Sequence, residues 1–174
     1  MTPLQKKINT IPKIVFTFAD IRKIAEMSDA SLRVSLNRMV RSGSIVRILK
    51  GVYTTDCARV DWEKFAQALY SPSALSFEYV LGREHILSQK PYALTLVTTK
   101  RARTIKAPRA TIVFRHIRPS LYWGYVRKNS TYIAEPEKAF LDLAYLSLNG
   151  YATFDSEEMN LSLLNLKKVS QYLK

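Results

Sequence analysis

The stretch between Ser28 and Gly43 carries side chains that suit the reading of DNA bases. Arginine can donate two hydrogen bonds to guanine, asparagine can pair with adenine, and a small apolar group can meet the methyl group of thymine. The candidate base-reading residues are Ser31, Arg33, Val34, Asn37, Arg38 and Arg41. The chemistry open to them is hydrogen bonding in a major groove, with no covalent step.

Hydroxyl and cationic side chains that suit phosphate groups flank this stretch. Phosphate contacts position a protein on a duplex without specifying its sequence. The candidate phosphate-contacting residues are Thr17, Ser28, Arg47 and Lys50. The two groups together predict a surface that binds double-stranded DNA.

Apolar residues at helical spacing predict the element that holds the base-reading group. Leu32, Leu36, Met39 and Val40 recur at intervals of four, three and one, a serine that can cap a helix precedes them, and a glycine follows. When these four face a core, a rotation of about 100° per residue turns the base-reading group outward. The alternative is an ordinary amphipathic helix with a basic outer face.

The neighbouring segments predict a complete small module around this helix. A helix is expected from Thr17 to Met27, and two β-rich runs, 44–49 and 52–54, surround a turn at Gly51. Residues 3–9 can form a preceding helix. This order is typical of a winged helix-turn-helix, which we expect to span residues 1–56.

The remainder, residues 57–174, is predicted to be a basic α+β C-terminal domain, a mixed α/β domain with a small sheet and C-terminal helices. Helices are expected near 62–69 and 76–81, strands at 93–98, 111–117, 121–126 and 131–134, and further helices from 136 and at 161–173. The last helix either closes this domain or joins two copies of the chain. The fold class predicted for the whole chain is therefore α+β.

The charge of the chain favours polyanionic partners. It carries 27 Lys and Arg against 14 Asp and Glu, a net charge of +13, and each neutralised phosphate releases condensed counterions. Residues 100–128 contain no acidic residue, and they predict a second basic surface made of Lys100, Arg101, Arg103, Lys106, Arg109, Arg115 and Arg118. With Tyr122, Trp123 and Tyr125 nearby, this surface could bind RNA or a protein; the alternative is a solvated sheet face.

Residue types that support catalysis or cofactors are scarce. A single cysteine, Cys57, and two histidines, His85 and His116, cannot form an intrachain disulfide or a Cys/His zinc cluster, which predicts a cytoplasmic protein without metal or cofactor. A metal-dependent nuclease needs clustered acidic residues, and the predicted strands carry Thr, Val, Arg and Tyr instead. Nuclease activity is the less favoured alternative to a protein that is not an enzyme. No apolar run is long enough for a membrane span, so no membrane partner is expected.

Several phrases of the sequence resemble the AbiEi family of antitoxins and transcriptional regulators from type IV toxin-antitoxin (abortive infection) systems. In the first module they are residues 40–47 and 50–53, and in the second they are 70–72, 97–101 and 133–142. The last of these, with Ala-Glu-Pro-Glu-Lys-Ala-Phe-Leu-Asp, resembles the family's Ala-x-Pro-Glu-Lys-Ala-Leu-x-Asp segment. The resemblance covers roughly residues 12–146.

The resemblance implies a function in phage defence. Such a protein represses its own operon by binding inverted repeats in its promoter with the winged helix. Its C-terminal domain counters a nucleotidyltransferase toxin without forming a stable complex with it. The chain departs from the family by ending soon after the Pro-Glu-Lys helix, and a stand-alone regulator of the same build is the alternative.

The Pro136-Glu137-Lys138 segment has a structural interpretation from its residues alone. Proline is favoured at the first position of a helix, and a glutamate there is stabilised by the helix dipole. Asp142 lies one turn beyond Lys138 and can pair with it along the helix. We therefore expect this segment to be part of the architecture and not a site.

Overall fold

Two compact units make up the computed structural model, which describes residues 2–153 and 156–173. Residues up to Asp61 form the first unit together with 107–109, and residues 62–106 and those from Ala110 onward form the second. The predicted domains, 1–56 and 57–174, also include positions 1, 154, 155 and 174, which lie outside the described residues. The boundary between them, after Asp56, stays a prediction.

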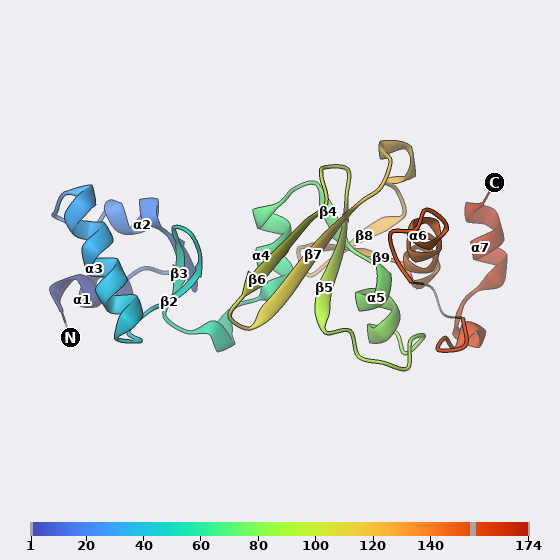
Figure 1. The fold of residues 1–174 in the computed structure, drawn as a ribbon, viewed down its shortest axis with the longest axis horizontal. Helices are drawn as coiled ribbons and strands as arrows, with labels where there is room; N and C mark the ends of the chain where they lie inside the picture. Colours follow the sequence, from blue (N-terminus) through green and yellow to red (C-terminus); the bar gives the residue numbers. More distant parts are fainter. Residues whose placement is uncertain (1, 154–155, 174) are drawn as a thin grey trace. The chain divides into compact units, whose positions relative to one another are not determined.

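The first unit combines three α-helices with a three-stranded antiparallel sheet (Figure 1). The helices are α1 (Pro3–Asn9), α2 (Phe18–Arg22) and α3 (Asp29–Arg41). The strands are β1 (Val15–Thr17), β2 (Val46–Leu49) and β3 (Val52–Thr54), in the order β1-β3-β2. Strand β1 was not predicted, because three residues are too few to show an alternating pattern.

A capping box fixes the start of α2. The Thr17 hydroxyl accepts the N–H of Asp20 at 3.2 Å, and the Asp20 carboxylate accepts the N–H of Thr17 at 2.8 Å. The helix ends at Arg22, so the prediction of a helix reaching Met27 was wrong. Ile21 and Ala25 still reach the core, but the residues after Ala25 form the turn into α3 instead of another helical turn.

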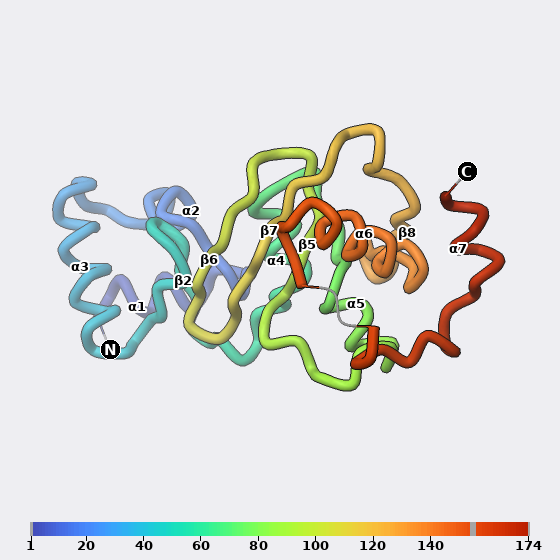
Figure 2. The backbone as a smooth tube through the Cα atoms, turned by 45° about the vertical axis from the view of Figure 1, so that its right-hand side comes forward, coloured from blue at the N-terminus to red at the C-terminus, as the bar shows by residue number. Residues whose placement is uncertain are grey.

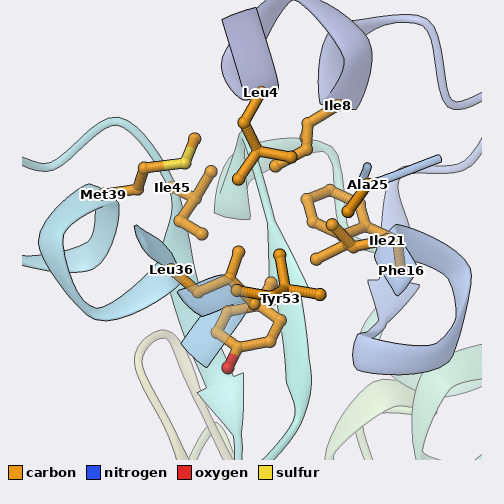
Figure 3. Close-up of a cluster of buried hydrophobic side chains, with 10 residues drawn as sticks. Leu4, Ile8, Phe16, Ile21, Ala25, Leu36, Met39, Ile45 and Tyr53 are labelled. Atoms are coloured by element: carbon orange, nitrogen blue, oxygen red, sulfur yellow. The ribbon is translucent and has the colours of Figure 1, made fainter. Parts of the chain in front are cut away.

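Apolar side chains from the helices and the sheet of the first unit meet in one core (Figure 3). Leu4 and Ile8 come from α1, Leu36 and Met39 from α3, and Tyr53 from β3, and all five are buried. Burying a large apolar side chain stabilises a fold by roughly 1.5–3 kcal/mol. This core therefore decides which face of α3 points inward.

The turn between β2 and β3 forms a wing beside the helices. Gly51 adopts a φ of 77°, a left-handed conformation that favours glycine, and its carbonyl oxygen accepts the N–H of Phe18 at 2.8 Å. The pairing of β2 with β3 shifts between Arg47 and Leu49. The bond to Phe18 ties the wing turn to the start of α2.

The second unit is built on a six-stranded mixed sheet in the order β6-β7-β5-β4-β9-β8. Its strands are β4 (Ser73–Leu75), β5 (Ala93–Thr98), β6 (Arg103–Ala107), β7 (Ala110–His116), β8 (Tyr125–Lys128) and β9 (Thr131–Ala134). Its α-helices are α4 (Trp62–Leu69), α5 (Phe77–Arg83), α6 (Pro136–Leu148) and α7 (Leu166–Tyr172). β5 runs parallel to β7 and antiparallel to β4, and β4 runs parallel to β9.

Helices cover both faces of this sheet. Phe114 on β7 packs edge-on against Tyr70, directly after α4, whereas the next residue, Arg115, contacts Glu78 of α5. Because successive side chains of a strand point to opposite faces, α4 and α5 lie on opposite sides. α6 packs against α5, and α7 packs against α6 (Figure 2).

The α+β prediction is confirmed, although several elements of the second unit differ from expectation. β4 and β6 were not predicted, since β4 is buried on every residue and β6 has only two apolar residues, Ile105 and Ala107. The strand expected at 121–126 begins only at Tyr125, after the short 3₁₀-helix Pro119–Leu121. The helix expected at 161–173 begins at Leu166, because Asn165 caps it by accepting the N–H of Lys168. No described helix is both long and apolar enough to cross a membrane.

Candidate nucleic-acid interface

Helix α3 presents its predicted base-reading face to solvent. Leu32, Leu36 and Met39 are buried on the inner face. All six candidates are exposed, namely Ser31, Arg33, Val34, Asn37, Arg38 and Arg41. Val34 is half exposed although it is apolar, which is what contact with a thymine methyl would require.

A groove of about 420 Å³ separates α3 from the wing and combines residues of both predicted groups. Arg33 and Asn37 line it from α3, and Arg47 and Lys50 line it from the wing. The Arg33 guanidinium lies 4.6 Å from the centre of the Phe18 ring, a cation–π contact that holds the side chain at the groove. Two base-reading candidates thus lie opposite two phosphate-contacting candidates.

Arg38 lies on the other flank of α3, away from the wing groove. It lines a second groove, also of about 420 Å³, with Met27, Ser42 and the first residues of α1. By helical rotation Val34 and Arg41 lie between the two flanks. The base-reading group therefore covers the full width of the exposed face.

The cationic candidates of this unit are uncompensated. Among residues 2–153 and 156–173, no carboxylate forms an ion pair with Arg33, Arg38, Arg41, Arg47 or Lys50. Three acidic residues of the unit pair elsewhere, Asp20 with Lys13, Asp29 with Arg22 and Glu26 with Lys7. Their positive charge is available to a polyanion.

The hydroxyl candidates serve first as helix caps. Ser28 accepts the N–H of Ser31 at 3.3 Å, and its own hydroxyl donates to the Ser31 hydroxyl at 3.0 Å. The Thr17 hydroxyl donates to Asp20 at 2.9 Å. The Thr17 backbone N–H and Lys13 lower the pKa of Asp20 to about 2, so Thr17 stands beside a carboxylate that is ionised at neutral pH.

The structure brings together only part of the predicted second basic surface. Lys100 and Arg101 line one pocket with Tyr70 and His116, and Arg103 lies 5.8 Å from the Tyr70 ring centre. Lys106 and Arg109 are exposed at the other end of the β6–β7 hairpin, and Arg118 is exposed at the start of the 3₁₀-helix Pro119–Leu121.

Arg115 departs from the expectation of a free cation. Its guanidinium nitrogen donates to both carboxylate oxygens of Glu78, at 2.7 and 2.9 Å, and lies 5.3 Å from the centre of the Phe77 ring. It is compensated and holds α5 against the sheet. Sequence reasoning missed this pair, because 37 residues separate its members.

The aromatic residues that were expected beside the basic surface gather around a buried lysine instead. The Lys138 ammonium lies 4.7 Å from the centre of the Trp123 ring and 5.3 Å from that of Tyr125. Burial raises the pKa of Tyr122 to about 12, and burial together with Asp142 raises the pKa of Tyr125. These rings are packing elements of the domain.

The predicted Lys138–Asp142 pair is confirmed, and it belongs to a larger buried network. Asp142 also accepts hydrogen bonds from Ser76 at 2.7 Å and Tyr125 at 3.0 Å, and Lys138 donates to the carbonyl of Leu121 at 3.0 Å. Burial raises the pKa of Asp142, although Lys138 opposes the shift. Sequence reasoning missed Ser76 and Tyr125, which come from distant segments.

The described residues contain no group of three or more His, Cys, Asp or Glu side chains that could hold a metal ion. His116 donates from Nδ1 to the carbonyl of Lys100 at 3.0 Å. Cys57 is buried, and burial raises the pKa of its thiol. The chemistry of the exposed surfaces is therefore cationic and hydrogen-bonding.

Three helices, an antiparallel three-stranded sheet and an exposed second helix of the helix-turn-helix define the first unit as a winged-helix module. The comparison with known families then gives the particular one. Residues 13–55 match the family described as "Transcriptional regulator, AbiEi antitoxin". The resemblance predicted from the sequence is confirmed for these residues, which are similar to a family of transcriptional regulators. No curated protein matches the chain.

Proposed function

We propose that the chain is a repressor that binds double-stranded DNA sequence-specifically, with α3 in the major groove and the wing on the adjacent backbone. The observation that supports this most directly is the exposed outer face of α3, flanked by a groove that Arg33, Asn37, Arg47 and Lys50 line. The uncompensated cations supply the attraction for phosphates. The amide and guanidinium groups supply the discrimination between bases.

The proposal divides the residues into two roles. Arg33, Val34, Asn37, Arg38 and Arg41 contact base edges, with Ser31 at the end nearest the helix start. Arg47 and Lys50 contact phosphates, and Ser28 contributes from the N-terminus of α3. Thr17 supports the phosphate-contacting group indirectly, by capping α2. Its hydroxyl donates its hydrogen to the Asp20 carboxylate and so does not donate to a phosphate.

The test compares variants on two duplexes, one from the DNA upstream of the chain's own gene and one of random sequence. Arg38→Ala should lose about 1–3 kcal/mol on the cognate duplex and little on the random one. Lys50→Ala should weaken both alike and reduce the salt dependence by about one phosphate contact. Fluorescence anisotropy at several salt concentrations measures both.

A matched control uses Lys6, an exposed cation of α1 that lines neither groove. Lys6→Ala removes the same charge and should leave both affinities nearly unchanged. Equal losses on cognate and random duplex for Arg38→Ala would contradict the assignment of that residue to bases. A loss for Lys6→Ala as large as for Lys50→Ala would contradict the docking geometry.

The regulatory setting is the second part of the proposal. The matching family is described as an antitoxin, which supports a cytoplasmic protein that represses its own operon at inverted repeats and counters a nucleotidyltransferase toxin. Co-expression with the neighbouring reading frame tests this. The chain should restore growth without co-purifying with the toxin, and failure to restore growth would refute the antitoxin role.

A further inference from the structure

An open pocket of about 630 Å³ lies at the edge of the sheet in the second unit. It is lined by Tyr70, which follows α4, by the four residues 99–102 that link β5 to β6, and by His116 at the end of β7. The DNA-binding proposal does not use it. Its lining combines the cations Lys100 and Arg101 with Tyr70, Thr99, Ala102 and His116.

The charge around this pocket is entirely positive. Lys100, Arg101 and Arg103 are exposed, and within the described residues none of them forms an ion pair with a carboxylate. In the same unit Arg115 and Lys138 do have carboxylate partners. Two uncompensated cations that line the pocket, with Arg103 beside its Tyr70 ring, therefore suit an anionic ligand.

The Tyr70 ring is fixed in place at this pocket. Its hydroxyl donates to the carbonyl of Arg101 at 3.2 Å, and its ring packs edge-on against Phe114 with the centroids 5.0 Å apart. The Lys100 ammonium and the Arg103 guanidinium lie 5.4 and 5.8 Å from the ring centre. A nucleotide base that stacked on this ring would therefore have Lys100 and Arg103 nearby to bind the phosphate of the same nucleotide.

We propose that this pocket binds single-stranded nucleic acid, with an unstacked base against Tyr70 and the adjoining phosphates on Lys100, Arg101 and Arg103. Stacking on aromatic rings together with a cationic path for the backbone is the general mode of single-strand binding. A duplex hides the faces of its bases and would use only the cations. The function goes beyond DNA repression and lies in another unit of the chain.

The experiment measures binding of the full chain to a labelled oligouridine of about 12 nucleotides, within the site sizes of single-strand-binding folds. Lys100→Gln with Arg101→Gln should weaken binding about tenfold and lower the salt dependence by roughly one unit. Tyr70→Leu should weaken it about tenfold through lost stacking. Tyr70→Phe keeps the ring and should bind almost as the wild type does.

The matched control removes the same charge at the opposite edge of the sheet. Arg127→Gln with Lys128→Gln lies on β8, whereas Arg103 lies on β6, and these strands form the two ends of the sheet. This control and Lys50→Ala in the winged helix should retain oligouridine binding. Lys50→Ala also distinguishes the two proposals, because it should weaken duplex DNA binding by the winged helix and leave oligouridine binding unchanged.

Three outcomes would overturn the proposal. The first is an equal loss for the two double variants, which would make the binding a general effect of net charge. The second is a base-paired hairpin binding as tightly as the oligouridine. The third is displacement of the oligouridine by uridine monophosphate at comparable concentration, which would make a free nucleotide the ligand. Because Lys100 and Arg101 are exposed, their variant should fold, and tryptophan fluorescence checks this.

Discussion

The buried Lys138–Asp142 pair gives the sharpest test of whether the Pro-Glu-Lys segment is architecture. Both side chains are 3% exposed. Lys138→Met leaves the Asp142 carboxylate buried with only the hydroxyls of Ser76 and Tyr125 as partners. Removing one member of a buried ion pair costs about 3–5 kcal/mol, because the other charge stays uncompensated. We expect this loss for Lys138→Met and a similar one for Asp142→Leu.

The double variant Lys138→Met/Asp142→Leu should be far less destabilised than the sum of the single ones. It removes both charges and leaves the Ser76 and Tyr125 hydroxyls without their acceptor, at about 1–3 kcal/mol for each hydroxyl. The single losses add to roughly 6–10 kcal/mol. Because the double variant leaves no uncompensated buried charge, its loss should be smaller than this sum, with a coupling energy of up to about 3 kcal/mol between the two positions.

The pH dependence of Lys138→Met carries a definite sign. Removal of the lysine takes away the charge that opposes the raised pKa of Asp142, so the folded-state pKa rises further above the unfolded value of about 3.9. A raised folded-state pKa gives stability that is fully present below the unfolded pKa and is lost as the pH rises through the folded one. The deficit of Lys138→Met should therefore shrink as the pH is lowered.

Urea unfolding followed by tryptophan fluorescence measures these changes in the full chain. The chain has two tryptophans, Trp62 and Trp123, and both lie in the second unit, so the signal reports that unit alone. Single variants that lose less than about 1 kcal/mol, or losses that simply add, would refute the reasoning. A stable Lys138→Met protein that loses antitoxin activity would make the segment a site.

Two further predictions concern carboxylates whose pKa is lowered. Asp20→Ala removes the capping box of α2 and should destabilise the first unit by about 1 kcal/mol, measured by far-ultraviolet circular dichroism. In the wild type the stability that Asp20 contributes is present above about pH 4 and is lost as the pH falls towards its folded-state pKa of about 2. Glu135 accepts from Lys168 at 2.7 Å and Tyr172 at 2.5 Å, contacts that lower its pKa and join α7 to the start of α6. Glu135→Gln should increase hydrogen exchange in α7. Acid should do the same in the wild type, because the stability from a lowered folded-state pKa is present above the unfolded-state pKa and is lost as the pH falls through the folded-state pKa. Unchanged exchange in both experiments would contradict this contact.

Much of the winged helix and of α6 was predictable from the sequence, because local spacing determines it. The spacing of Leu32, Leu36 and Met39 fixes the inner face of α3, and rotation about the helix then places the outer face without knowledge of any other segment. Gly51 marks the wing turn through its left-handed backbone. The Lys138–Asp142 pair was predictable for the same reason, since its members lie one helical turn apart.

Only the tertiary structure decided which distant residues meet. It pairs Arg115 with Glu78 and leaves Lys100 and Arg101 without a carboxylate partner, and it brings the Tyr70 ring against Phe114 and near the Lys100 ammonium. These contacts depend on the order of the strands in the sheet. That order could not be predicted, because short strands such as β4 show no clear periodicity in the sequence. A sequence records helical and strand periods directly because they arise between near neighbours, whereas the compensation or freedom of a charge depends on segments that only the folded chain brings together.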